Sequence, residues 1–237
     1  MTTVVISQPM YFPWPGFLAQ LAIADVVVWL VDVQFSKGSF TNRVQVRTPG
    51  GRSWLSIPLV GKGSKTAIMD LTAAKPDWLD GHLATLRQSL RHAPHAATAL
   101  EIASSIAGHA RLCDALIASS ETLARACGIP TPQTCLSTDL AVPGDGSDRV
   151  LGIVKAVGGT RYVTGHGARN YLDHTGFADA GVAVDYMDYA VTAWRDSADF
   201  TPFVTGLDLL AHTGGAHART YLNPQTIGWQ DFLTRSG

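Results

Sequence analysis

The sequence predicts an α/β fold: a Rossmann-like three-layer domain with a largely parallel sheet and a helical middle segment. A β-branched run at residues 4–7, a helix-like segment at 16–24 and a second β-branched run at 26–31 together have the size of a βαβ unit. Short apolar runs alternate with helical segments again after residue 133, which is typical of parallel sheets. Between these regions, apolar residues recur at helical spacing over residues 75–128.

The remaining elements follow from local signals. Residues 43–47 and 53–59 flank the turn Pro49-Gly50-Gly51 and predict a hairpin. We expect a short strand at 134–136, a helix from about 148 to 157, strands at 161–164 and 182–186, and a short helix at 199–210. The chain shows no internal repeat and no linker. We therefore predict one domain over residues 1–237, with a helical insertion at about 75–128.

Composition narrows the class of protein. Hydrophobic residues make up 46% and charged residues 16% of the chain, enough for a sizeable core. The net charge is -1 and the basic residues look scattered, so we expect no nucleic-acid partner. The longest apolar run, residues 22–33, is too short to span a membrane, and no secretory signal is visible. The three cysteines form no CxxC pair, which suits a reducing cytoplasm.

The segment after the first predicted strand is rich in proline and aromatic residues. Gln8 and Tyr11 offer polar groups, and Tyr11 and Trp14 offer flat apolar walls, at the edge where open α/β sheets bind ligands. We interpret this segment as one wall of a small-molecule pocket. The alternative is a structural plug whose aromatic rings seal the end of the sheet.

A second polar cluster follows the second predicted strand and should lie on the same edge of the sheet. It consists of Asp32, Gln34, Lys37, Asn42 and Arg43. Lysine and arginine suit a carboxylate or phosphate, and arginine can bind either in a bidentate manner. The alternative is a solvated loop with a surface salt bridge.

A third cluster follows the strand predicted at 161–164. Gly165 and Gly167 let the backbone approach a ligand closely, and His166 between them can act as a general base. Arg169 and Tyr171 come directly afterwards. The alternative is a tight turn with a hydrogen-bonded histidine.

A fourth cluster is the pair Asp208 and His212, and the remaining histidines bear on whether the chain binds a metal. Asp208 and His212 are spaced i and i+4, so in a helix the carboxylate can orient the imidazole, or His212 can simply favour the helix end. The other histidines show no HExxH pattern and no paired acidic ligands. We therefore predict no metal site, and the sequence does not identify a cofactor.

Taken together, these motifs resemble the WbqC-like family over nearly the whole chain. The resemblance is carried by the following residues in order: Ile6-Ser7-Gln8-Pro9, Tyr11, Pro13-Trp14, Gly16, Ala24-Asp25, Asp32 to Lys37, Asn42-Arg43, Trp54-Leu55, Pro58, Trp78, His82, Ala93-Pro94, Gly158, Tyr162, Gly165, Tyr171-Leu172 and Asp208-Leu209-Leu210. The family occurs among bacterial genes for polysaccharide and other specialised biosynthesis, and the resemblance implies transfer of an amino acid, specifically glycine, onto a sugar. Phe40 and the His212–His217 region depart from the family pattern, which bears on the substrate.

The leading hypothesis is a cytoplasmic transferase that forms an amide or ester bond to a small-molecule substrate, such as a sugar or a carrier-bound acyl group. Gln8, Asp32, Gln34 and Asn42 would orient the substrate. Positive charge for a carboxylate or phosphate would come from Lys37, Arg43 and Arg169, and His166 or His82 would accept the proton. The alternatives are an ATP-dependent ligase or nucleotidyl-transfer enzyme, and a non-catalytic module that binds a carrier protein or a biosynthetic partner.

Overall fold

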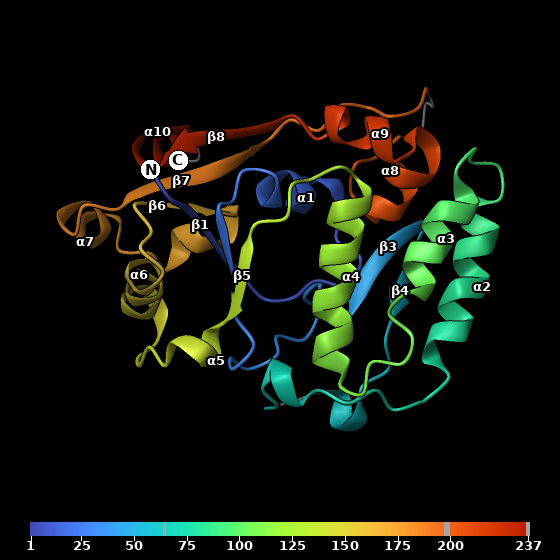
Figure 1. The fold of residues 1–237 in the computed structure, drawn as a ribbon, viewed down its shortest axis with the longest axis horizontal. Helices are drawn as coiled ribbons and strands as arrows, with labels where there is room; N and C mark the ends of the chain where they lie inside the picture. The colour runs from blue at the N-terminus through green and yellow to red at the C-terminus, as the bar shows by residue number, and fades with distance from the viewer. Residues whose placement is uncertain (64, 197–199, 236–237) are drawn as a thin grey trace.

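A six-stranded sheet in the order β5-β2-β1-β6-β7-β8 forms the centre of the computed structural model, which describes residues 1–63, 65–196 and 200–235 (Figure 1). The strands are β1 (Thr3–Ser7), β2 (Val26–Trp29), β5 (Gln133–Leu136), β6 (Arg161–Thr164), β7 (Ala183–Tyr189) and β8 (Pro224–Gly228). All neighbours pair in parallel except β7 and β8. The predicted α/β class with a largely parallel sheet is therefore confirmed.

Helices cover both faces of this sheet. Side chains alternate along a strand, so Val5 of β1 joins one hydrophobic core while Val4 and Ile6 join the other. The first core also contains residues of α1 (Pro15–Leu21), α2 (Trp78–Leu90), α3 (Ala96–Ser104), α4 (Leu112–Ala126) and α8 (Gly206–Thr213). The second contains residues of α6 (Gly146–Ala156), α7 (His174–Asp179) and α10 (Trp229–Arg235). The three-layer prediction is confirmed.

The hairpin forms as expected from β3 (Arg43–Thr48) and β4 (Gly51–Ser56), which pair in antiparallel fashion. Its inner face places Val44, Val46 and Leu55 in the first core. Shorter elements complete the chain: α5 (Ser137–Leu140), α9 (Gly215–Ala218), and the 3-10 turns η1 (Val60–Gly63), η2 (Ile68–Asp70), η3 (His166–Asn170) and η4 (Arg219–Tyr221).

Some element boundaries differ from the prediction. The helix expected at 199–210 begins only at Gly206, because Thr205 acts as its N-cap and accepts a hydrogen bond from the amide of Leu207 at 3.3 Å. Residues 197–199 lie outside the described part of the chain. The sequence patterns also missed β8 and α10. No helix in the described ranges is long and apolar enough to cross a membrane.

The order of the strands creates a switch in direction beside β1. From β1 the chain passes through α1 to β2 on one side, whereas β6 pairs with the other side of β1 and leads on to β7. Open α/β sheets bind ligands outside the carboxyl ends of the strands at such a point. The ends of β1 and β6 are therefore the first place to look for a site.

Candidate functional site

A cleft of about 330 Å³ opens at the carboxyl ends of β1 and β6. It is lined by Ile6, Ser7, Gln8, Met10, Trp14, Phe17, Gln20, Leu30, Val150, Tyr162, Thr164, Gly165, Gly167, Ala168, Tyr171 and Tyr189. None of these lining residues carries a charge. The cleft thus combines amide and hydroxyl groups with broad aromatic surfaces.

Trp14 forms the wall on the β1 side. Its indole lies directly over Gly16, where a Cβ atom would stand only 2.1 Å from the ring. The ring packs against Tyr189 and Phe203 at centroid distances of 4.9 and 5.6 Å. Gly16 therefore leaves room for the indole, and Trp14 lines the cleft. That Trp14 contacts a ligand stays a prediction.

Tyr189 and Gly165 form the wall on the β6 side. A Cβ atom at Gly165 would lie 2.9 Å from the Tyr189 hydroxyl, so the absence of a side chain lets this hydroxyl approach the backbone. Tyr162 donates a hydrogen bond to Thr164 at 3.1 Å below it. Burial raises the pKa of Tyr189 to about 12, and burial also raises the pKa of Tyr171. Both phenols therefore remain hydrogen-bond donors at neutral pH.

His166 lies at the rim of this cleft but does not line it. Its ring packs against Tyr189 at 5.0 Å and Phe232 at 4.9 Å. Its Nε2 atom lies 2.8 Å from the carbonyl oxygen of Met187. Since a carbonyl oxygen only accepts, Nε2 must carry the proton, and Nδ1 of the neutral ring then holds the lone pair. Arg169, in the same 3-10 turn, is exposed and does not line the cleft either.

Tyr11 and His82 meet in the core rather than in the cleft. The Tyr11 hydroxyl lies 2.9 Å from Nδ1 of His82, and both side chains are buried and contact Trp78. Burial lowers the pKa of His82, although a hydrogen bond with the Ser56 backbone acts in the opposite direction. Tyr11 therefore does not line the cleft and packs in the core, as in the alternative interpretation of this segment as a structural plug. Gln8 and Trp14 of the same segment do line the cleft.

Asp32 is tied into a structural ion pair. It accepts hydrogen bonds from Arg149 of α6 and from Ser137, the latter at 2.7 Å. Burial alone would raise the pKa of Asp32, but the bonds from Arg149 and Ser137 hold it below its usual value. Asp32 does not line the cleft, because this network turns its carboxylate toward α5 and α6.

The loop after Asp32 leads into the β3–β4 hairpin. Gln34 and Lys37 are exposed, and the backbone of Gln34 bridges to Ala67. Asn42 donates a hydrogen bond to the carbonyl of Ile57 at 2.9 Å. The Arg43 guanidinium bonds to the carbonyl of Gly38 and lies 4.1 Å above the ring of Trp54.

A separate pair on α8 is formed by the buried Asp208 and the partly buried His212. Asp208 accepts a hydrogen bond from Nε1 of Trp194 at 2.8 Å, and Nδ1 of His212 lies 3.6 Å from the same carboxylate oxygen. Burial raises the pKa of Asp208, opposed by His212, Trp194 and Arg47. Neither Asp208 nor His212 lines the cleft.

Several residues that line the cleft were not among the predicted site residues; Gln20 and Tyr189 are two polar examples. Gln20 is a buried glutamine in the otherwise apolar helix α1, where it donates a hydrogen bond to the carbonyl of Val163 at 3.0 Å. Its polarity inside an apolar helix was a usable signal. Tyr189 comes at the end of β7, a position that only the strand order reveals as part of the site.

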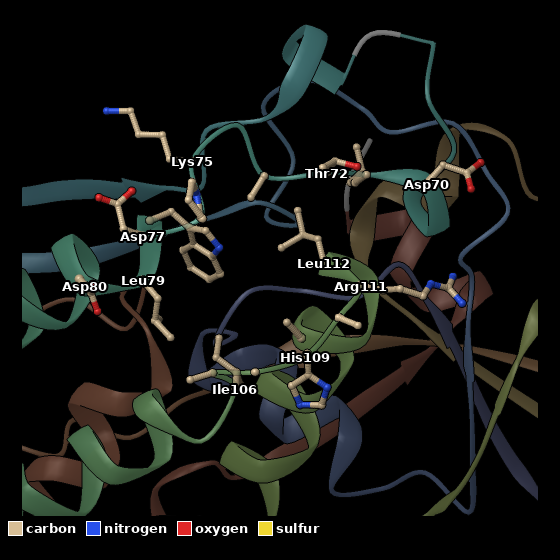
Figure 2. Close-up of a pocket in the computed structure, with 18 of the residues that line it drawn as sticks. Asp70, Thr72, Lys75, Asp77, Leu79, Asp80, Ile106, His109, Arg111 and Leu112 are labelled. Carbon is tan, nitrogen blue, oxygen red and sulfur yellow. The ribbon is translucent and has the colours of Figure 1, made fainter.

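A larger cavity, about 640 Å³, lies between residues 69–80 and 106–115 (Figure 2). Figure 2 shows Asp77 and Asp80 on one side of it and Arg111 on the other. None of the predicted site residues lines this cavity. The described residues also contain no group of three or more histidines, cysteines or acidic residues placed to hold a metal ion.

Comparison with known proteins defines the family. The model of the WbqC-like protein family matches residues 8–220, a range that contains the tyrosine and tryptophan walls of the cleft. An uncharacterized protein of Mycobacterium tuberculosis, Rv1507c, is 28% identical over 230 residues, covering 94% of this chain and 98% of its own length. No solved structure matches the chain. Because the family match extends over far more than half of the sequence, the chain belongs to the WbqC-like protein family.

Proposed function

We propose that this chain is a cytoplasmic transferase that joins an acyl or aminoacyl group, such as glycine, to a hydroxyl or amine of a sugar held in the switch-point cleft. The observation that carries the proposal is an uncharged, aromatic-walled cleft with a histidine at its rim. Glycine as the transferred group rests on the family resemblance alone.

The chemistry of the cleft favours a sugar ring. Trp14 and Tyr189 supply flat surfaces, and aromatic faces suit the apolar faces of pyranose rings. Gln8, Thr164 and Tyr171 supply amide and hydroxyl groups that can bond to hydroxyls on the ring. A cleft without charged lining residues does not favour a strongly charged group at its centre.

His166 is the preferred proton acceptor. The bond from Nε2 to the Met187 carbonyl fixes the tautomer, so Nδ1 can take the proton from the attacking hydroxyl or amine. The attacking atom then forms a bond to the acyl carbon, the bond from that carbon to the leaving group breaks, and the proton passes to the leaving group. His82 is less suited, because it is buried and bonded to Tyr11.

Acyl transfer also needs donors for the oxygen that becomes negatively charged. Gly165 and Gly167 line the cleft, so the backbone reaches the ligand there without a side chain in between. The Tyr189 hydroxyl, with its raised pKa, is a further donor beside Gly165. Gly165 and Gly167 flank His166 in the chain, and the His166 ring contacts Tyr189, which supports a base at the rim close to these donors.

The test is a transfer assay followed by mass spectrometry, with free and phosphorylated sugars as acceptors and with acyl thioesters and aminoacyl adenylates as donors. His166→Gln should lower kcat at least 100-fold with a smaller change in KM, because general base catalysis contributes about 10²–10⁴-fold. His217→Gln is the matched control, since His217 is exposed on α9 and does not line the cleft. Full activity of the His166 variant would overturn the assignment.

The same assay separates the alternative functions. An ATP-dependent ligase would form product from a free acid only when ATP and a divalent metal are added. A non-catalytic module would form no product with any donor, and its partner would have to cover Trp14. If a sugar quenches the tryptophan fluorescence of the wild type and this quenching is lost in Trp14→Phe, the result supports the cleft as the binding site.

A further inference from the structure

The basic residues are distributed less evenly than the overall charge suggests. Residues 33–69 contain six lysines and arginines and no aspartate or glutamate, whereas the other 200 residues contain 12 basic and 19 acidic residues. The six are Lys37, Arg43, Arg47, Arg52, Lys62 and Lys65. A chain of net charge -1 therefore carries one segment of charge +6. Such a segment attracts anions.

The β3–β4 hairpin gathers part of this charge on its outer face. In the pairing register, Gln45 lies opposite Trp54 and Arg43 lies opposite Ser56, so these side chains share the face turned away from Val44 and Leu55. Arg52 is on the same face and donates a hydrogen bond to Gln45 at 3.1 Å. Trp54 is 39% exposed, so this face is accessible.

Two buried donors, one in the loop before β3 and one in the first residue of β3, have no acceptor in the described part of the chain. Nε of Arg43 and Oγ of Ser39 are buried, and neither has a hydrogen-bond partner among the described residues. Nearly all buried polar groups in proteins are hydrogen-bonded, so an orphaned donor calls for an explanation. Two such donors in a stretch of five residues, within a segment of charge +6, indicate the place of a bound anion.

This loop is attached to the wall of the switch-point cleft. The amide of Tyr11 donates to the carbonyl of Phe40 at 3.0 Å, and the Thr41 hydroxyl donates to Oε1 of Gln8 at 3.4 Å. Gln8 itself lines the cleft. A substrate whose ring occupies the cleft can therefore extend past Gln8 toward the hairpin.

We propose that the loop from Lys37 to Arg43 and the outer face of the hairpin bind the phosphoryl groups of a substrate whose sugar ring lies in the cleft. The substrate class is a sugar linked to phosphate or pyrophosphate; this identification rests on the proposed function. Pyrophosphate is favoured over a carboxylate because it offers several negative charges and oxygens to several cations. A single-stranded nucleic acid is less suited, because Arg43 already covers one face of Trp54 and Phe40 packs against the ring at 5.7 Å.

The test is calorimetry with three probes: inorganic pyrophosphate, a nucleoside diphosphate sugar, and the same sugar without phosphate. Lys37→Gln and Arg52→Gln should each weaken binding of the first two probes about tenfold, the loss of one charge-assisted contact. Ser39→Ala should weaken them without lowering the thermal stability of the free protein, since its hydroxyl has no partner there. Arg87→Gln, at an exposed site on α2, is the matched control and should bind as the wild type does.

The outcomes separate this inference from the proposed function. Binding of the free sugar without any gain from its phosphate overturns the inference and leaves the transferase standing. Tight binding of pyrophosphate that depends on Lys37 supports the inference. If the His166→Gln variant keeps its activity at the same time, the assignment of His166 as the base is overturned while the inference stands. A polyprenyl pyrophosphate in micelles distinguishes a lipid-linked substrate from a soluble nucleotide sugar. Stronger binding of a single-stranded oligonucleotide than of pyrophosphate would overturn the inference in favour of nucleic acid.

Discussion

Gly16→Ala tests whether Trp14 holds the wall of the cleft. A Cβ atom at this position would stand 2.1 Å from Cη2 of Trp14, whereas carbon atoms in contact lie about 3.5–4.0 Å apart. The indole must therefore move away from Gly16 by roughly 1.5 Å, which disturbs its contacts with Tyr189 and Phe203. Each aromatic pair contributes about 0.5–1.5 kcal/mol, so we expect the free energy of unfolding to fall by about 2 kcal/mol.

Gly81→Ala provides the matched control. Gly81 lies inside α2 at an exposed position, and nothing stands within 4 Å of the Cβ atom that the substitution would add. Alanine in a helix interior is more stable than glycine by about 0.8–1.0 kcal/mol, so this variant should become more stable. The same substitution thus has opposite signs at two helical glycines.

Urea denaturation gives both free energies, and binding of the sugar or sugar phosphate gives the functional consequence. In a protein of this size, a loss of 2 kcal/mol corresponds to a fall in Tm of about 4–8 °C. Affinity should fall for Gly16→Ala and stay unchanged for Gly81→Ala. If Gly16→Ala is as stable as the wild type and binds as well, the indole does not occupy the position described.

Three further predictions concern buried polar groups. Asp32→Asn should cost about 1.5–3 kcal/mol at pH 7, because Arg149 loses a charged partner. Since the folded pKa of Asp32 is lowered, the difference from wild type should begin to shrink as the pH falls below about 4 and disappear once the pH is below the folded pKa, as urea denaturation at several pH values will show. Tyr11→Phe should lower the free energy of unfolding by about 1–2 kcal/mol by leaving the buried Nδ1 of His82 without its hydrogen-bond partner, and an unchanged Tm would contradict this. Asp208→Asn keeps an acceptor for Trp194 and removes a buried carboxyl group whose pKa is raised. The stability of the wild type should therefore decline relative to this variant as the pH rises above the usual carboxylate range, which urea denaturation at several pH values measures. Equal pH profiles of the two proteins would refute the raised pKa of Asp208.

The fold was largely predictable because its core elements are encoded locally. The β-branched runs of β1, β2 and β6, the turn of the hairpin and the helical spacing between residues 75 and 128 are each visible without tertiary information. Strand β8 was not predictable, because its residues Pro-Gln-Thr-Ile-Gly show neither a β-branched run nor apolar alternation. Its place at the edge depends on pairing with β7, which no local pattern reveals.

The candidate site was predictable in place but not in detail. The rule that ligands bind at strand ends brought Gln8 and Gly165 together correctly, since β1 and β6 are neighbours. The direction of a side chain depends on partners that are distant in sequence. Asp32 turns toward Arg149, 117 residues further on, and Tyr11 turns toward His82, 71 residues further on. Sequence reasoning had no access to these contacts.

The central position of β1 has a consequence for the newly made chain. β1 pairs on one edge with β2, which follows about 20 residues later. Its other edge stays unpaired until β6 has been synthesised, about 150 residues further on. At about 5–20 residues per second, ribosomes need on the order of 10 s to supply that partner. During this interval the edge of Thr3-Val4-Val5-Ile6 is free to pair with other nascent chains. Expression at lower translation rates or without chaperones should therefore aggravate aggregation of this protein.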